Sequence, residues 1–193
     1  MTSKSGSSPE PDEHHSAAIL PLFSAAAIGA RVQALAGEIA QRPAAGEAPL
    51  VLIGLLRGAI PFANDLSRAL GTRGLKLAID YVSASSYGSG KVSSGNVMVK
   101  TRPSIALNGR DILIVDDILD TGLTMEAVIA AFSREAPARI ATCVLLDKRA
   151  RRLNGLHADF VGFPCPDLFV VGYGMDLDDR FRELPFIGTL ASP

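Results

Sequence analysis

The chain has 193 residues, of which 48% are apolar, and its formal net charge at pH 7 is −1. This length fits one domain with a sizeable core, and the near-zero charge argues against a partner that is a polyanion such as DNA or RNA. The apolar runs are too short to cross a bilayer, so we expect neither nucleic acid nor membrane as a partner.

Residues 1–16 are rich in serine, proline and charge, which predicts a disordered tail ahead of a single domain over residues 17–193. The apolar stretch from Ala17 to Ala30 contains Pro21 and follows acidic residues, so it lacks the pattern of a signal peptide. We interpret it as the lead-in to a helix and expect a cytoplasmic protein. Cys143 and Cys165 are expected to be buried and reduced, although the sequence leaves a disulfide between them open.

The first predicted helix spans residues 25–41, because Ser24 is a good N-cap and apolar residues recur at helical spacing on one face: Ile28, Val32, Leu35 and Ile39. After a linker, the apolar run of residues 50–55 is typical of a strand covered on both faces. A helix over residues 61–70 and a strand over residues 75–83 follow. Residues 85–96 are polar and glycine-rich, which predicts a long mobile loop that closes over a site.

The second half of the chain continues the alternation of strands and helices. We predict strands over residues 97–100, 111–115, 139–146, 160–162 and 169–173, and a helix over residues 124–134. Apolar strands that alternate with amphipathic helices indicate an α/β fold with a largely parallel, twisted sheet flanked by helices. Ligands of such sheets bind beyond the carboxyl ends of the strands.

The most informative segment covers residues 112–124, with the sequence ILIVDDILDTGLT. We expect its strand to end at Asp116 and Asp117, where adjacent carboxylates can hold diol hydroxyls or a hydrated magnesium ion. Residues 120–124 then turn into a helix, whose exposed amides and dipole suit a phosphate monoester, and Gly122 lets the backbone approach that anion. The alternative is an acidic turn with an N-capping threonine, which the full string makes the weaker interpretation.

This string closely resembles the phosphoribosyl pyrophosphate motif of type I phosphoribosyltransferases. Further segments resemble the hypoxanthine-guanine branch of that family: a pyrophosphate loop at residues 56–58, a closing loop at 85–88, a purine-reading strand at 146–149, and a C-terminal hood at 169–176 and 182–188. The likeness runs from about Leu22 to Leu190. It implies the type I phosphoribosyltransferase fold, with a core over about residues 48–150 and a small hood from about residues 17–47 and 151–193.

The resemblance implies a purine salvage enzyme. It would transfer the 5-phosphoribosyl group from phosphoribosyl pyrophosphate to hypoxanthine or guanine, with Mg²⁺ as cofactor, and would release IMP or GMP and pyrophosphate. Its partners would be these two substrates and further copies of the chain, in a dimer or a tetramer. The preference among hypoxanthine, guanine and xanthine stays open.

The resemblance also assigns roles to individual residues. The general acid/base at purine N7 would be Asp120. The ribose 5-phosphate part of phosphoribosyl pyrophosphate would bind at Asp116, Asp117, Asp120, Thr121, Gly122, Leu123 and Thr124, and its pyrophosphate at Leu56, Arg57, Gly58, Ser86, Tyr87 and Arg182. The purine would contact Ile118, Lys148, Phe169 and Val170, with Lys148 donating to the 6-oxo group and Phe169 stacking on the ring. Magnesium would be held by Asp116, Asp117 and Asp176.

Plainer interpretations stand beside these roles. Phe169 also fits a core position, as most aromatic residues do, and Lys148 also fits a solvated surface position. Asp178 and Asp179 fit a solvated turn. Arg57 stands where many relatives have lysine, and because the family contact is made through backbone around a cis peptide, the role of the Arg57 side chain stays open.

Two other classes of protein share parts of the pattern. A receiver-type phosphoacceptor domain also uses paired aspartates at a strand end, but it needs a further strand-end aspartate that this chain does not clearly supply. A phosphoribosyltransferase-like regulator that controls RNA or DNA would need a basic face, which the charge balance does not provide. The sequence therefore favours the enzyme.

Overall fold

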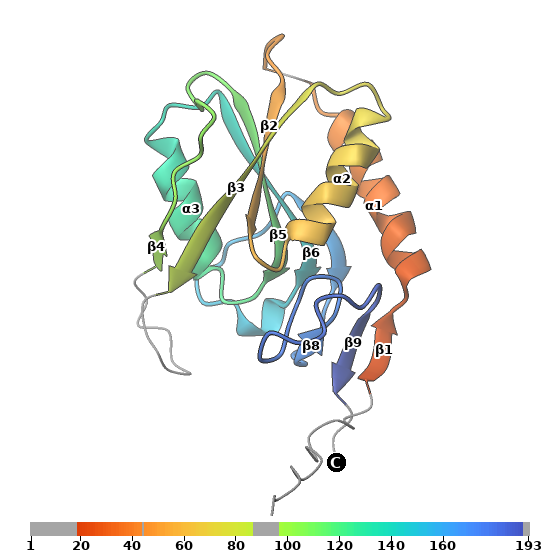
Figure 1. The fold of residues 1–193 in the computed structure, drawn as a ribbon. Helices are drawn as coiled ribbons and strands as arrows, with labels where there is room; N and C mark the ends of the chain where they lie inside the picture. The colour runs from red at the N-terminus through yellow and green to blue at the C-terminus, as the bar shows by residue number, and fades with distance from the viewer. Residues whose placement is uncertain (1–18, 44, 87–96, 191–193) are drawn as a thin grey trace, which may run out of the picture.

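The computed structural model describes residues 19–43, 45–86 and 97–190. Within these residues a six-stranded sheet has the order β4-β3-β2-β5-β6-β7, and a three-stranded sheet has the order β1-β9-β8 (Figure 1). The helices α1 (Ala25–Ala40) and α2 (Ile60–Gly71) cover one face of the larger sheet, and α3 (Leu123–Ser133) covers the other. The predicted α/β class is confirmed. Over the described ranges, no helix has the length and hydropathy needed to span a membrane.

The larger sheet is parallel except at one edge. Its parallel strands are β2 (Leu50–Leu56), β3 (Leu77–Ser86), β5 (Asp111–Leu119), β6 (Arg139–Asp147) and β7 (Phe160–Pro164). The edge strand β4 (Val97–Val99) pairs antiparallel with the end of β3. Because the parallel strands share one direction, their carboxyl ends lie at the same edge of the sheet, and this edge faces downward in Figure 1.

The central strand β2 explains how the sheet is held between its helices. Leu52 belongs to the core cluster formed with α1 and α2, whereas Val51 and Ile53 belong to the cluster formed with α3. This alternation buries residues 51–55 of the predicted run, whereas Leu50 at its start is half-buried. The predicted apolar face of α1 is also buried, and Ser24 caps that helix by accepting a hydrogen bond from Ala27 N at 3.2 Å.

The smaller sheet joins segments from near the two ends of the chain, and we call it the hood. Its strand β1 (Ile19–Phe23) pairs antiparallel with β9 (Ile187–Leu190), which also pairs with β8 (Val170–Val171). The stretch from Ala17 to Ala30 was interpreted as the lead-in to a helix. Residues 25–30 do form the start of α1, but the interpretation was wrong for residues 19–23, which form a strand. Their partner strand is distant in sequence, so the local pattern carries no sign of the backbone hydrogen bonds that it supplies.

Two predicted strands ended too early. The strand β3 continues to Ser86, because Ser85 and Ser86 pair with residues of β4. The first two residues of the predicted loop of residues 85–96 are therefore part of a strand, and the others, including Tyr87, lie outside the described part of the chain. The strand β5 continues to Leu119, because β6 stays beside it to that point. Asp116 and Asp117 thus lie within the strand and not after its end.

Candidate active site

A cleft of about 400 Å³ lies at the carboxyl edge of the parallel strands, next to the hood. It brings together residues from the predicted pyrophosphate loop, the Asp-Asp motif, the purine-reading strand and the C-terminal segment. These are Leu56, Arg57, Gly58, Asp117, Ile118, Asp120, Lys148, Phe169, Val170, Asp176 and Arg182. The cleft also contains two residues that the sequence did not single out, Arg151 and Met175.

A second cavity of about 100 Å³ adjoins the cleft, with Ile118 and Asp120 lining both. Its other lining residues are Asp116, Leu119, Thr121, Gly122, Thr124 and Met125. The helix α3 starts here, and its first backbone hydrogen bond runs from Glu126 N to Gly122 O at 3.0 Å. The preceding amides of residues 123–125 therefore have no acceptor within the helix, and together with the helix dipole they suit an anion.

Gly122 is required in this turn for two reasons. Its φ is +86°, and a Cβ atom there would lie 2.3 Å from Asn154 Oδ1 and 2.8 Å from Arg152 Cδ.

We expect Gly122→Ala to lower the free energy of unfolding by about 1–3 kcal/mol and to weaken the binding of inorganic phosphate. Urea unfolding and calorimetry will measure these two effects. The control is Gly155→Ala, because Gly155 has a φ of +63° but no atom within 4 Å of a Cβ. Equal loss of phosphate binding in both variants would contradict this account.

The paired carboxylates of β5 stand between the two cavities. Asp117 N donates a hydrogen bond to Asp116 Oδ1 at 3.0 Å. Burial, and then the negative charge of Asp117, raises the pKa of Asp116 well above its usual range. Two full charges at this place are therefore unfavourable without a ligand, and a cation or a diol that donates hydroxyl hydrogens would stabilise them. Gly58 leaves room for the pair, since a Cβ at Gly58 would lie 2.1 Å from Asp117 Oδ2.

Asp120 follows the end of β5 and carries a buried oxygen without a hydrogen bond. Among the described residues, Asp120 Oδ1 has no donor in hydrogen-bond geometry, and its nearest cation is Arg151 Nε at 3.3 Å, an ion-pair contact. A buried acceptor that lacks a donor is unfavourable, so this oxygen is a place for a donor from a ligand in the cleft.

Lys148 and Phe169 form the part of the cleft next to Asp120. Lys148 N donates to Leu119 O at 3.0 Å, which holds the end of β6 beside the Asp120 turn. The Lys148 ammonium is buried and donates to Leu168 O at 2.7 Å, so two of its three hydrogens remain for a ligand. The side chain of Phe169 is 55% exposed and lines the cleft, so the alternative that it is a core residue was wrong.

A model of the phosphoribosyl transferase domain matches residues 22–178. The chain belongs to this family. It is 45% identical over 138 residues to the hypoxanthine-guanine phosphoribosyltransferase of Bacillus subtilis, which covers 72% of this chain and 75% of that protein. It is 40% identical over 165 residues to the hypoxanthine phosphoribosyltransferase of Escherichia coli, which covers 86% and 91%, respectively. The solved structure of a Trypanosoma cruzi hypoxanthine phosphoribosyl transferase superposes with a TM-score of 0.83 at 38% identity, over 94% of this chain and 95% of that one.

Membership of the phosphoribosyltransferase family excludes the receiver-type domain considered from the sequence, and it agrees with the resemblance of the Asp-Asp motif. The peptide bond between Leu56 and Arg57 is cis, as that resemblance implied. Leu123 opens α3 without lining either cavity, which leaves only its amide as a contact with an anion. Ser86 ends β3, and its side chain lies outside what the structure describes.

The two arginines expected at the pyrophosphate side are joined by aspartates. Arg57 Nη2 donates to Asp179 Oδ1 at 3.2 Å, and Arg182 Nη2 lies 2.6 Å from Asp176 Oδ1 and 3.7 Å from Asp179 Oδ1. Asp179 is exposed and lies in a turn, as the sequence indicated, but its pairing with both arginines was not foreseen. Arg57 and Asp179 are far apart in the sequence and meet only in the folded protein, so no local pattern indicates their pairing.

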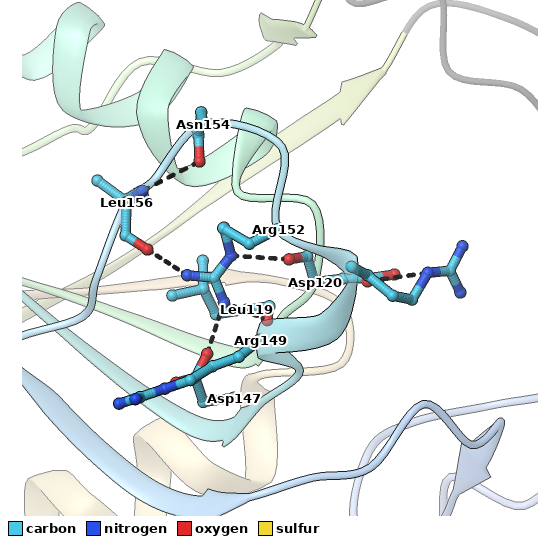
Figure 2. Close-up of polar contacts among 8 residues, drawn as sticks. Leu119, Asp120, Asp147, Arg149, Arg152, Asn154 and Leu156 are labelled. Atoms are coloured by element: carbon cyan, nitrogen blue, oxygen red, sulfur yellow. Dashed lines mark hydrogen bonds and ion pairs between the residues drawn. The ribbon is translucent and has the colours of Figure 1, made fainter.

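The arginine run after β6 is the other feature that the sequence did not single out. Arg151 reaches the cleft, whereas Arg152 is buried between the ends of β5 and β6 (Figure 2). The sequence does not predict which of the three arginines Arg149, Arg151 and Arg152 is buried, because composition carries no information on the solvent exposure of a single arginine. The structure separates them, with side-chain exposures of 72%, 50% and 7%, respectively.

Proposed function

We propose that the chain transfers the 5-phosphoribosyl group from phosphoribosyl pyrophosphate to hypoxanthine or guanine and releases IMP or GMP and pyrophosphate. The observation that carries the proposal is the buried oxygen of Asp120, which has no hydrogen-bond donor among the described residues and only an ion-pair contact with Arg151. It lies in one cleft with Lys148 and Phe169 and borders the anion cavity at the start of α3. A 6-oxopurine presents a matching group to each of these: an N–H donor to Asp120, a 6-oxo acceptor to Lys148 and an aromatic face to Phe169.

The two cavities accommodate the two parts of the product nucleotide. The 5-phosphate would occupy the smaller cavity and accept from the free amides of residues 123–125, and the ribose diol would reach Asp116 and Asp117. The base would lie in the larger cleft between Phe169 and Ile118. There Lys148 would donate to the 6-oxo group, and the carbonyl of Val170 would accept from the 2-amino group of guanine.

The reaction follows from where charge develops. As the bond between ribose C1 and the pyrophosphate oxygen breaks, positive charge grows on the ribose and negative charge on the leaving group, and purine N9 forms the new bond to C1 from the opposite face. The purine becomes more acidic as N9 bonds to carbon, and Asp120 accepts the proton from N7. Arg57 and Arg182 stabilise the leaving pyrophosphate by electrostatic attraction.

Magnesium is the proposed cofactor, and the residues present fit it. Among the described residues there is no cluster of three or more acidic, histidine or cysteine side chains that could hold a metal alone. Mg²⁺ does not need one, because one or two carboxylates, water and substrate phosphates are its usual ligands. Asp117 and Asp176 reach the cleft and Asp116 adjoins it, so these residues would hold the ion. When bound, it neutralises charge on the leaving pyrophosphate.

An assay with phosphoribosyl pyrophosphate, Mg²⁺ and one purine at a time tests the function. We expect nucleotide from hypoxanthine or guanine and little from adenine. The reaction with xanthine will show whether this further purine is also a substrate. Chromatography that separates the base from its nucleotide gives the readout. Absence of nucleotide with every base would refute the enzyme and favour a regulator that only binds nucleotides.

We further propose a cytoplasmic homo-oligomer, a dimer or a tetramer. Cys143 and Cys165 are both free and buried, which suits a reducing compartment. In the Trypanosoma cruzi hypoxanthine phosphoribosyl transferase, the C-terminal region has a role in the oligomeric state, and in this chain the C-terminal region contributes strands to the hood. Light scattering coupled to size-exclusion chromatography will give the mass of the assembly.

A further inference from the structure

The buried Arg152 connects the turn between β5 and α3 to the end of the neighbouring strand β6. Arg152 Nε donates to Asp120 O at 2.9 Å, and Arg152 Nη2 donates to Leu119 O at 2.9 Å (Figure 2). Its Nη2 also pairs with Asp147 Oδ1 at 2.5 Å, and its Nη1 donates to Leu156 O. The guanidinium thus holds the end of β5, the end of β6 and the following loop at fixed separations.

The backbone after Arg152 reinforces the same connection. Leu153 N donates to Thr121 O at 3.0 Å, so residues 119–121 each have a carbonyl held by residue 152 or 153. Asn154 Nδ2 donates to Glu126 Oε2 at 2.8 Å, in the first turn of α3. The turn that positions the anion-binding amides is therefore fastened from its outer side by residues that do not line the anion cavity.

An ordinary charge-balancing role does not account for this arrangement. Asp147 is buried, and although burial raises its pKa, hydrogen bonds from Arg149 and Arg152 outweigh that effect and hold its pKa below the usual range. A lysine at position 152 could neutralise this carboxylate equally well. Only the planar guanidinium, with five N–H donors in a fixed fork, can serve the carboxylate and three carbonyls at once.

We propose that Arg152 is a positioning residue of the phosphate site, which holds the turn between β5 and α3 so that the free amides of residues 123–125 converge on one anion. This inference rests on the proposed function for the identity of the anion, the 5-phosphate of the ribose. Arg152 does not line either cavity, and its effect on the ligand passes through the carbonyls of Leu119 and Asp120.

Comparison of two ligands of the same protein tests the proposal. Ribose 5-phosphate should depend on the turn, whereas magnesium pyrophosphate should bind at the Arg57 and Arg182 side of the cleft. In Arg152→Lys we expect calorimetry to show ribose 5-phosphate affinity lowered by about 10- to 150-fold, the effect of losing one hydrogen bond between a backbone amide and the charged phosphate. Pyrophosphate affinity should stay within about twofold. If Arg152 only stabilised the fold, the two affinities would not differ in this way, because each affinity is measured for the folded protein.

The matched control is Arg149→Lys, the same substitution at a neighbour that pairs with Asp147 at 2.9 Å but is 72% exposed. It should leave both affinities within about twofold, because lysine keeps a positive charge beside Asp147 and the Arg149 side chain forms no hydrogen bond with the turn between β5 and α3. If Arg152→Lys does not fold, the double variant Arg152→Gln, Asp147→Asn removes both buried charges together and avoids an unpaired one. It should show the same selective loss of ribose 5-phosphate binding.

The outcomes separate this proposal from the proposed function. Equal losses for the two ligands, or unchanged ribose 5-phosphate affinity in both Arg152 variants, would overturn the positioning role. A wild-type protein that binds ribose 5-phosphate but forms no nucleotide with any purine would instead overturn the enzyme and leave the binding comparison valid.

Discussion

Asp120→Asn is expected to lower kcat by about 10²–10⁴-fold, the usual contribution of a general acid or base. The amide keeps the size of the side chain but cannot accept the purine proton, and the backbone of residue 120 can still bond to Arg152. Binding of phosphoribosyl pyrophosphate should therefore be nearly unchanged. Steady-state kinetics with hypoxanthine, together with calorimetry, will measure both quantities.

Asp167→Asn is the matched control for this variant. Asp120 and Asp167 are both paired with Arg151, at 3.3 Å and 3.7 Å, respectively, but only Asp120 lines the cleft. Loss of the Asp167 carboxylate should therefore leave kcat within about twofold, as for other exposed ion pairs. Turnover like that of the wild type in a folded Asp120→Asn protein would remove Asp120 from the mechanism.

Lys148→Met should reduce kcat/KM for hypoxanthine by about 10- to 150-fold. A hydrogen bond from a charged donor contributes about 1.5–3 kcal/mol, and about 1.4 kcal/mol corresponds to a factor of ten. An ammonium has donors only, so it favours a 6-oxo group and opposes the 6-amino group of adenine. The preference for hypoxanthine over adenine should therefore narrow in the variant, while the affinity for phosphoribosyl pyrophosphate changes little.

The structure adds a second effect of this substitution and a way to separate it. The variant leaves Leu168 O without the ammonium that now donates to it, so we also expect a lower melting temperature. Lost stability acts on both bases equally and cancels in the ratio of their kcat/KM values. Arg149→Met, at the exposed neighbouring position, should leave that ratio unchanged. The same hypoxanthine-to-adenine ratio in wild type and Lys148→Met would show that Lys148 does not select the base.

Features set by near neighbours in the chain were predictable from the sequence. The helix α1 with its Ser24 cap, the buried strand β2 and the start of α3 within one residue of its predicted place all depend on local spacing. The Asp-Asp motif was equally recognisable, because its residues lie in a single continuous segment. The cleft residues Lys148 and Phe169 followed from the resemblance and not from the pattern alone.

Features that depend on partners distant in sequence were missed. The strand β1 forms because it pairs with β9, and β5 is longer than predicted because β6 pairs with it to Leu119. Asp179 pairs with Arg57, which is far from it in sequence. Burial of Arg152 is a further case, because two of its acceptors, the carbonyls of Leu119 and Asp120, lie more than 30 residues earlier in the chain. Such contacts carry no periodic signal along the chain, so only the assembled fold reveals them.

The pairing of β1 with β9 also has a consequence for biosynthesis. The first described strand pairs with a strand more than 160 residues further along the chain, so this contact has a high contact order and should form slowly. While the chain emerges from the ribosome, the parallel sheet can assemble around β2 before residues 187–190 are made. The nascent protein would therefore acquire the turn between β5 and α3 first, and the wall that contains Val170 would be completed only after residues 187–190 have been made.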